Sequence, residues 1–296
     1  MSETTNPNAA AAQPAQKSTA ESSGGSRIPQ RFRELAGRGE LGLVAYVTAG
    51  DPSLEATEQI VLAAAGAGAD VIELGVPFSD PVADGPTIQR ASDRALRAGT
   101  TLAGVIDLVR KLRTRTRAPL ILFSYFNPML QMGIEKFADA AAQAGADGVL
   151  ATDLTLEEAG DYRAAMHAHG LDTIFLAAPT STDERLAKIA KCSSGFLYLI
   201  SRTGVTGTRD ALAEDLPALA RRVRSFTKLP LAVGFGISMP EHVSMLGGIA
   251  DAAVVGSAIV AEIEKARNAK EAAANVARLI GALKDAARSG ISRRAP

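Results

Sequence analysis

From residue 43 onward, short apolar runs alternate along the chain with longer amphipathic runs rich in Ala, Leu and charged residues. The short runs have the length and composition of buried strands, and we predict eight: Leu43–Thr48, Asp70–Gly75, Pro119–Tyr125, Asp147–Ala151, Thr173–Ala178, Gly195–Ser201, Leu231–Phe235 and Ala252–Val255. The longer runs predict helices, among them Leu54–Ala67, Thr101–Thr114, Ile134–Ala144 and Glu157–His169. This alternation predicts a parallel sheet with helices outside it, and eight units in about 250 residues are typical of a (β/α)8 barrel. The predicted fold class is therefore α/β, a single TIM barrel, with an open doubly wound sheet as the alternative.

A weak internal repeat supports the barrel. The segment Ala67-Gly-Ala-Asp70 recurs as Ala144-Gly-Ala-Asp147, with looser copies around Asp172 and Asp251. In each copy a glycine suits the end of a helix, and the aspartate leads into a strand. We therefore expect these aspartates at the amino ends of strands, on the barrel face opposite the active site, in structural roles.

The first 26 residues differ in composition from the rest of the chain. They are rich in Ala, Ser, Thr, Gln, Pro and Gly and contain no large apolar residue after Met1. Such a segment buries too little surface to offset the entropy cost of ordering. We expect residues 1–26 to be a disordered tail and residues 27–296 to form the catalytic barrel. The tail lacks an apolar segment and contains Glu3 and Glu21, unlike a targeting peptide.

Composition argues against several classes of function. The chain has 32 basic and 32 acidic residues, so there is no general electrostatic reason to expect nucleic acid as a partner. It has no uncharged apolar run of about 18 residues, so no membrane span is expected. Its one cysteine, Cys192, permits no internal disulfide and fits a reducing cytosol, and we expect a cytoplasmic protein.

Glu73 is the residue with the most informative position. It lies near the end of the run Asp70–Gly75, and a Pro- and Gly-rich loop with two further carboxylates follows it. In a strand, Val71 and Glu73 point to one face while Ile72 and Leu74 point to the other. If Val71 points into a core, so does Glu73, and a buried glutamate is almost always paired or used. The alternative is a surface strand in which Glu73 faces water.

Glycine-rich turns follow the last three predicted strands, at the end of the barrel where the active site is expected. The turns are Ser201–Thr208, Gly234-Phe-Gly236 and Gly256-Ser257. Glycine allows a backbone to approach a ligand closely, and a helix N-terminus offers free N–H groups to an anion. Three such turns at one end favour a phosphate site, although glycine also ends strands for conformational reasons alone.

The histidines, the cysteine and the lysines do not lie at the carboxyl ends of the predicted strands, where the active site is expected. The three histidines fall on predicted outer helices: His167, His169 and His242. This placement argues against a Ser-His-Asp set or a histidine metal site, and no metal is expected. Cys192 precedes the sixth strand on the opposite face, and no lysine lies at a strand end to form a Schiff base. Acid–base chemistry by carboxylates remains, and the candidates lie at or after strand ends: Glu73, Asp80, Asp84 and Asp153.

Four segments stand out as a set: Tyr46-Val-Thr-Ala-Gly-Asp-Pro52, Glu73-Leu-Gly-Val-Pro-Phe-Ser-Asp-Pro-Val-Ala-Asp-Gly-Pro-Thr-Ile-Gln89, Ser201-Arg-Thr-Gly-Val-Thr-Gly207 and Gly234-Phe-Gly-Ile-Ser238. In order and spacing they resemble the tryptophan synthase alpha chain, and the resemblance extends over about residues 27–265. It implies a (β/α)8 barrel that cleaves indole-3-glycerol phosphate to indole and glyceraldehyde 3-phosphate, in the last stage of tryptophan biosynthesis. This carbon–carbon lyase reaction is a retro-aldol cleavage that needs no metal or organic cofactor.

The resemblance also implies roles for individual residues. Glu73 aligns with the general acid/base of the family, and Asp84 with the aspartate that contacts the indole N–H. Positions that bind the phosphate align with Gly207, Gly236, Gly256 and Ser257. Positions around the indole and glycerol align with Tyr46, Phe123, Tyr125, Leu150 and Tyr198, although such residues in barrel strands are more often core. The stretch Arg202–Thr208 resembles a mobile lid, in which Thr206 would hydrogen-bond Asp84 on closure.

A partner is implied as well. In the family, indole passes to a beta chain that uses PLP, in an alpha2-beta2 assembly, so PLP is expected in the partner and no cofactor in this chain. The segment Asp153-Leu-Thr-Leu-Glu-Glu158 departs from the frequent Asp-Leu-Pro-Pro-Glu-Glu in the region facing that partner. Two other functions stay open: another phosphosugar enzyme on the same barrel, such as an isomerase, or a binding subunit that mainly activates and gates the beta chain.

Overall fold

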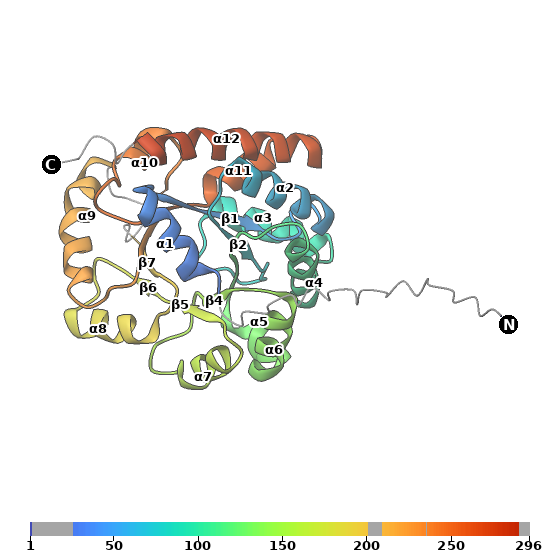
Figure 1. Cartoon of the computed structure of the whole chain (residues 1–296), viewed down its shortest axis with the longest axis horizontal. Helices are drawn as coiled ribbons and strands as arrows, with labels where there is room; N and C mark the ends of the chain where they lie inside the picture. Colours follow the sequence, from blue (N-terminus) through green and yellow to red (C-terminus); the bar gives the residue numbers. More distant parts are fainter. Residues whose placement is uncertain (2–25, 201–208, 235, 290–296) are drawn as a thin grey trace.

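The chain folds around one parallel sheet that curves into a barrel with its helices outside (Figure 1). The computed structural model describes residue 1 and residues 26–200, 209–234 and 236–289. The strands are β1 (Gly42–Thr48), β2 (Val71–Gly75), β3 (Leu120–Ser124), β4 (Gly148–Ala151), β5 (Asp172–Ile174), β6 (Leu176–Ala177), β7 (Leu197–Ile200), β8 (Leu231–Gly234) and β9 (Ala252–Val255). They follow the order β5-β4-β3-β2-β1-β9-β8-β7-β6.

The barrel closes within the fifth predicted strand. We predicted one strand over Thr173–Ala178, whereas the structure has β5 and β6 on either side of Phe175. The reason is that β5 pairs with β4 and β6 pairs with β7, so each half follows a different neighbour. The two edges of the sheet therefore meet in one continuous segment. This closure confirms the (β/α)8 barrel.

The helices follow the predicted alternation. They are α1 (Ile28–Arg38), α2 (Leu54–Ala67), α3 (Pro86–Arg97), α4 (Leu102–Arg113), α5 (Phe126–Met132), α6 (Ile134–Ala144), α7 (Gly160–Ala168), α8 (Asp183–Cys192), α9 (Arg209–Arg224), α10 (Pro240–Ser244), α11 (Ser257–Glu264) and α12 (Ala269–Ser289). Two have the predicted bounds, whereas α7 begins three residues later than predicted, because Glu158 N–H donates to Thr155 O in a preceding turn. In the described ranges, no helix is long and apolar enough to cross a lipid bilayer.

Two apolar cores lie on opposite faces of the sheet. The outer core packs the helices against residues such as Ile72 and Leu74. The inner core fills the barrel with Val71 and its counterparts on other strands, and α1 closes one end, where the Phe32 ring lies 5.7 Å from that of Phe196. Val71 thus points inward, and Glu73 points to the same side, where its charge acts on Tyr46 and Tyr198, as predicted.

The aspartates of the internal repeat lie at the strand amino ends, as predicted. Asp70 accepts a hydrogen bond from Leu43 N–H at 2.8 Å, and Asp147 accepts one from Leu120 N–H at 2.8 Å. Asp251 does the same for Leu231 N–H at 2.7 Å. Each of these three aspartates therefore accepts a backbone N–H at the amino end of the neighbouring strand, which is a structural role. The fourth, Asp172, is the first residue of β5.

Two sequence predictions lie outside the described residues. One is the disordered tail, of which residues 2–25 are not described. The other is the lid at residues 202–208.

Candidate active site

Glu73 lies on β2 inside the barrel, and only 1% of its surface is exposed. Neither carboxylate oxygen has a hydrogen-bond partner among the described residues. Burial raises the pKa of Glu73 to about 8, because desolvation disfavours the charged form. The carboxyl group is therefore mostly protonated at neutral pH and can donate a proton. It makes no described structural bond that would explain its burial.

A buried tyrosine and a half-buried tyrosine face Glu73 from other strands. Tyr46 lies on β1 and Tyr198 on β7. Their hydroxyls lie over glycines, since a Cβ on Gly75 would come 2.1 Å from Tyr46 Oη and one on Gly234 would come 2.6 Å from Tyr198 Oη. Burial is the main cause that raises the pKa of both phenols, with a further contribution from the charge of Asp84 for Tyr46 and from that of Glu73 for Tyr198. Both hydroxyls therefore stay neutral and are available as hydrogen-bond donors.

An apolar wall adjoins these groups. The half-buried Phe123 on β3 meets Tyr46 edge-on, with ring centroids 5.2 Å apart and an interplanar angle of 81°. Leu150 on β4 pairs in register with Phe123 and is fully buried in the inner core. Phe123 thus borders the site, whereas Leu150 packs beneath it. The edge of Phe123 suits contact with a flat aromatic ring.

Asp84 is held by a tyrosine at the end of β3. Tyr125 Oη donates to Asp84 Oδ2 at 3.1 Å and accepts from Ala83 N–H at 2.9 Å. The Phe78 ring stacks on Tyr125 with centroids 5.0 Å apart. Burial raises the pKa of Asp84 to about 6, and the bond from Tyr125 partly opposes that rise. At neutral pH Asp84 is therefore mostly ionised, while Glu73 is mostly protonated.

The candidate phosphate positions that the structure describes lie on neighbouring strands. Gly236 follows β8 and has a φ of 77°, in the region that favours glycine. Gly256 follows β9 as the N-cap of α11, and Ser257 is the first residue of that helix. Because β8 pairs with β9, these backbone N–H groups lie at the same end of the barrel. Thr206 and Gly207 lie outside the described residues.

A network of charged side chains links the elements that carry these groups, and sequence reasoning missed it. Arg94 on α3 donates to both oxygens of Asp51 at 2.8 Å, and Asp51 is buried after β1. Glu264 on α11 accepts from Arg94 at 2.8 Å and from Arg90 twice at 2.9 Å. The network therefore connects α3, which follows the Asp84 loop, to α11, which begins at Ser257. No local pattern indicates it, because its partners are far apart in sequence.

The other carboxylate candidates lie away from Glu73. Asp80 is exposed and accepts a hydrogen bond from Ser79 Oγ at 2.6 Å. Asp153 is exposed and accepts a bond from Phe126 N–H at 2.7 Å, at the start of α5. Asp80 bonds to its sequence neighbour and Asp153 to the start of another element, and both are exposed, so neither residue belongs to the buried group. In the described part of the chain, no three His, Cys, Asp or Glu residues group so as to hold a metal ion.

Comparison with known proteins identifies relatives over most of the chain. Residues 32–288 match the family model of the tryptophan synthase alpha chain. The tryptophan synthase alpha chain of Solibacter usitatus is 54% identical over 251 residues, which cover 85% of this chain and 93% of that protein. The alpha chain of Geobacter sulfurreducens is 48% identical over 261 residues, covering 88% of this chain and 98% of that protein.

Solved structures agree in fold. Tryptophan synthase subunit alpha from Legionella pneumophila superposes with a TM-score of 0.79 at 38% identity, covering 88% of this chain and 98% of that one. A chain of Mycobacterium tuberculosis tryptophan synthase gives a TM-score of 0.82 at 34% identity, covering 89% and 99%. The motifs, the barrel and these relatives together show that the chain belongs to the tryptophan synthase alpha chain family.

Proposed function

We propose that this enzyme is a carbon–carbon lyase that cleaves indole-3-glycerol phosphate to indole and glyceraldehyde 3-phosphate, with Glu73 as its general acid and base. The observation that carries the proposal is a buried Glu73 without a described partner, at the barrel end where Tyr46 and Tyr198 converge. Family membership supports the same reaction.

The reaction begins with proton donation. Glu73, whose pKa is about 8, gives its proton to indole C3 and forms the indolenine tautomer. The carboxylate that results then takes the proton of the C3′ hydroxyl. The C3–C3′ bond breaks, its electron pair restores the indole ring, and the C3′ oxygen becomes the aldehyde of glyceraldehyde 3-phosphate. Glu73 ends protonated, so one residue completes the cycle without another proton source.

Asp84 stabilises the charge that appears between these steps. Protonation at C3 places positive charge on the indolenine N1–H, and an anionic Asp84 accepts that N–H. The bond from Tyr125 holds Asp84 and, by favouring its charged form, keeps it anionic. Phe123 and Tyr46 would border the indole, and Leu150 would support them from the inner core.

The phosphate would bind at the ends of β8 and β9. Gly236, Gly256 and Ser257 offer backbone N–H groups there, and the N-terminus of α11 favours an anion. Gly207 and Thr206 are proposed to complete the site from the lid, Gly207 at the phosphate and Thr206 at Asp84. Tyr198 would lie near the reacting glycerol.

We also propose a partner. The indole would pass to a tryptophan synthase beta chain in an alpha2-beta2 assembly in the cytoplasm, completing tryptophan biosynthesis. PLP would belong to the beta chain, and this chain would use no cofactor of its own. In support, the solved relative from Mycobacterium tuberculosis is a chain of tryptophan synthase.

The direct test is indole release from indole-3-glycerol phosphate by the purified chain, with and without a cognate beta chain. We expect slow release that the partner accelerates. Glu73→Gln should lower the rate by about 10²–10⁴-fold, while Asp80→Asn should leave it unchanged, because Asp80 is exposed and bonds locally.

Other results would favour the alternatives. Release that survives Glu73→Gln would overturn the assigned role of Glu73 but not the reaction. No release under either condition, with a beta chain that still responds to this chain, would instead indicate a regulatory subunit. No release together with turnover of another phosphosugar would indicate an isomerase.

A further inference from the structure

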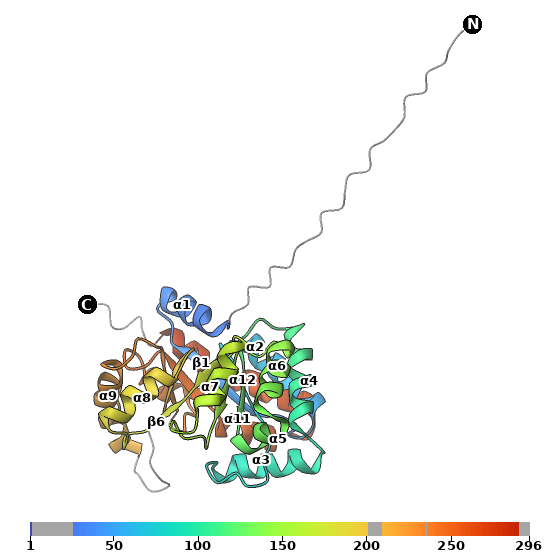
Figure 2. The same cartoon turned by 90° about the horizontal axis from the view of Figure 1, so that it is seen from below.

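A cavity lies at the end of the barrel opposite the proposed active site. It has a volume of about 790 Å³ and lies between α1, α2 and the connection from α4 to β3. Figure 2 shows α1 at one end of the barrel and α3, which follows the Asp84 loop, at the other. Among the described residues, one glutamate, Glu34, and four arginines line the cavity: Arg27, Arg31, Arg113 and Arg117. We propose that this cavity binds a compact polyanion that carries two phosphate groups.

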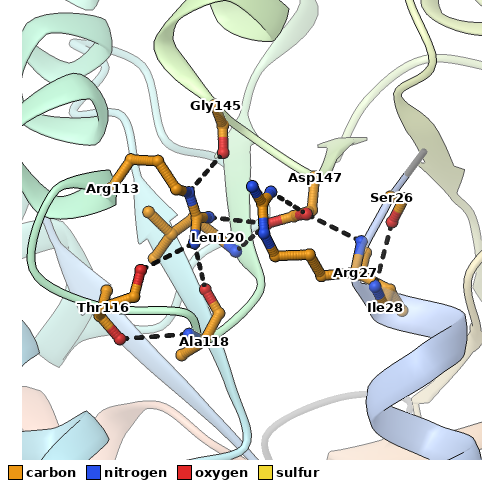
Figure 3. Close-up of polar contacts among 9 residues, drawn as sticks. All are labelled: Ser26, Arg27, Ile28, Arg113, Thr116, Ala118, Leu120, Gly145 and Asp147. Atoms are coloured by element: carbon orange, nitrogen blue, oxygen red, sulfur yellow. Dashed lines mark hydrogen bonds and ion pairs between the residues drawn. The ribbon is translucent and has the colours of Figure 1, made fainter. Parts of the chain in front are cut away.

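Arg113 organises one wall of the cavity (Figure 3). Its guanidinium donates to Asp147 Oδ2 at 2.8 Å and to the carbonyls of Thr116 and Ala118 at 3.0 Å. Ala118 N–H donates in turn to Thr116 Oγ1 at 3.1 Å. These bonds hold the loop on both sides of Arg117. The loop therefore presents Arg117 at the cavity from a fixed position.

Asp147 also holds Arg27 beside Arg113. The Arg27 backbone N–H and its guanidinium both donate to Asp147 Oδ1 at 2.9 Å. The dashed lines in Figure 3 meet at Asp147 from both arginines. Two guanidinium groups thus share one fully buried carboxylate, and 42% of the Arg27 side chain stays exposed. Burial is the main cause that lowers the pKa of Arg113; the charge of Asp147 opposes this effect, and the neighbouring charge of Arg27 adds to it.

Donors remain available on other arginines of the lining. Arg31 pairs with Asp70 at 2.8 Å and with Glu34 at 3.2 Å, but its buried Nε has no hydrogen-bond partner among the described residues. Arg117 is exposed, and its side chain makes no hydrogen bond or ion pair with any residue that the structure describes. A ligand at the cavity would satisfy these N–H groups.

The charge around the cavity is positive. The four arginines face three carboxylates, Glu34 in the lining and Asp70 and Asp147 beneath it, so one positive charge is in excess. Of the five cations in the segment Arg110–Arg117, Arg113 and Arg117 line the cavity. Guanidinium groups bind phosphate oxygens in pairs, and their fixed fork geometry suits that anion better than a lysine does.

The lining also indicates the size and type of the ligand. The apolar residues of the cavity are small: Ala65, Ala69, Ala118 and Pro119. No aromatic side chain among the described residues lines it, so these residues offer a nucleobase no ring to stack on. The volume is within the range of small-molecule sites, about 300–1,000 Å³. A small molecule with two phosphates therefore fits better than a nucleotide.

The experiment uses inorganic pyrophosphate as the probe and the full chain as the protein. Calorimetric titration at constant ionic strength is performed with saturating glycerol 3-phosphate, which occupies the proposed phosphate site at β8 and β9. We expect one saturable site. Arg117→Gln and Arg31→Gln should each raise its Kd by about tenfold or more, and Arg33→Gln should change it less than about twofold. Arg33 is the matched control, because it is exposed on α1 but does not line the cavity.

Three outcomes would overturn the proposal. The first is the absence of saturable binding at millimolar pyrophosphate. The second is equal weakening by Arg33→Gln, which would indicate general surface attraction. The third is an affinity that Arg117→Gln and Arg31→Gln leave unchanged. Misfolding would not explain a loss in Arg117→Gln, because that side chain has no partner among the described residues. Among the described residues, the cavity shares none with the proposed active site, so the effects of the arginine variants on pyrophosphate binding do not depend on the proposed reaction.

Discussion

At the scale of the single residue, the position of Glu73 couples activity to stability. The pKa is about 8 in the folded protein and 4.5 for the free group. Between these values the unfolded chain loses the proton while the folded chain keeps it, so stability falls as the pH rises. The loss is about 1.4 kcal/mol per pH unit, on the order of 3 kcal/mol near pH 7.

Glu73→Gln should remove this dependence. Glutamine does not titrate, so the variant should gain stability relative to the parent as the pH rises from 5 to 8, while losing activity. Urea unfolding at several pH values measures the difference. A stability difference that is the same at pH 5 and pH 8 would contradict the assigned burial of an ionisable Glu73. Glu34→Gln, on the exposed surface of α1, serves as the control.

The pH dependence of the rate provides a second prediction. The proposed mechanism needs an ionised Asp84 and a protonated Glu73, whose pKa values are about 6 and about 8. We expect kcat/KM to rise with pH through about 6 and to fall through about 8. Asp84→Asn should lower kcat/KM by about 10²-fold and abolish the acidic limb alone. A profile whose acidic limb survives in Asp84→Asn would assign that limb to another group.

The surroundings of Glu73 could be predicted from the sequence, whereas those of Asp84 could not. The burial of Glu73 follows from strand geometry, because its side chain shares a face with Val71. The setting of Asp84 could not be derived in that way, since it depends on a bond from Tyr125, 41 positions further along the chain. A loop has no periodicity from which such a contact could be inferred.

At the scale of the element, the network around Arg94 connects α3 to α11. Hydrogen bonds from Arg90 and Arg94 lower the pKa of Glu264 to about 2, so the network is charged at working pH. Glu264→Gln should weaken the link between the two helices while the Arg94–Asp51 pair remains. We expect kcat/KM to fall about tenfold, mainly through KM, because the phosphate site would shift relative to Asp84. The free energy of unfolding should change by less than about 1 kcal/mol.

A matched variant tests whether this effect is specific. Glu58 on α2 pairs with Arg115, which follows the end of α4. Glu58→Gln should therefore leave KM unchanged. An equal rise of KM in both variants would show that any lost surface ion pair has the same consequence.

Helices with strong local signals were predictable. Leu54–Ala67 has Ser53 as its cap at one end and Gly68 at the other, and the predicted bounds match the structure. The split of the fifth strand was not predictable, because it depends on which neighbours β5 and β6 pair with. Pairing between strands depends on tertiary structure and cannot be inferred from a run of apolar residues.

At the scale of the whole molecule, the residues at the end of the barrel closed by α1 stabilise the fold and take no part in the proposed reaction. Asp147→Ala would leave the Arg113 charge and the Leu120 N–H without their acceptor in a buried setting, at a cost of about 3–5 kcal/mol. Asp251 caps Leu231 in the same way but is 38% exposed, so Asp251→Ala should cost about 1–3 kcal/mol. Urea unfolding compares the two, and equal losses would contradict this account. KM should stay unchanged in both, since the active site lies at the other end.

The division of the fifth strand at Phe175 makes the barrel mechanically uneven around its circumference. Elsewhere each strand has a partner on both sides, whereas β5 pairs only with β4 and β6 only with β7. The sheet therefore has a seam at this point. Amide hydrogens on β5 and β6 should exchange with solvent faster than those on β1 and β2, and a barrel under strain should part there first. Glu73 on β2 and Tyr46 on β1 lie away from the seam, whereas Tyr198 on β7 pairs with Leu176 of β6 beside it. Opening of the seam should therefore displace Tyr198 and leave the proposed acid and Tyr46 in place.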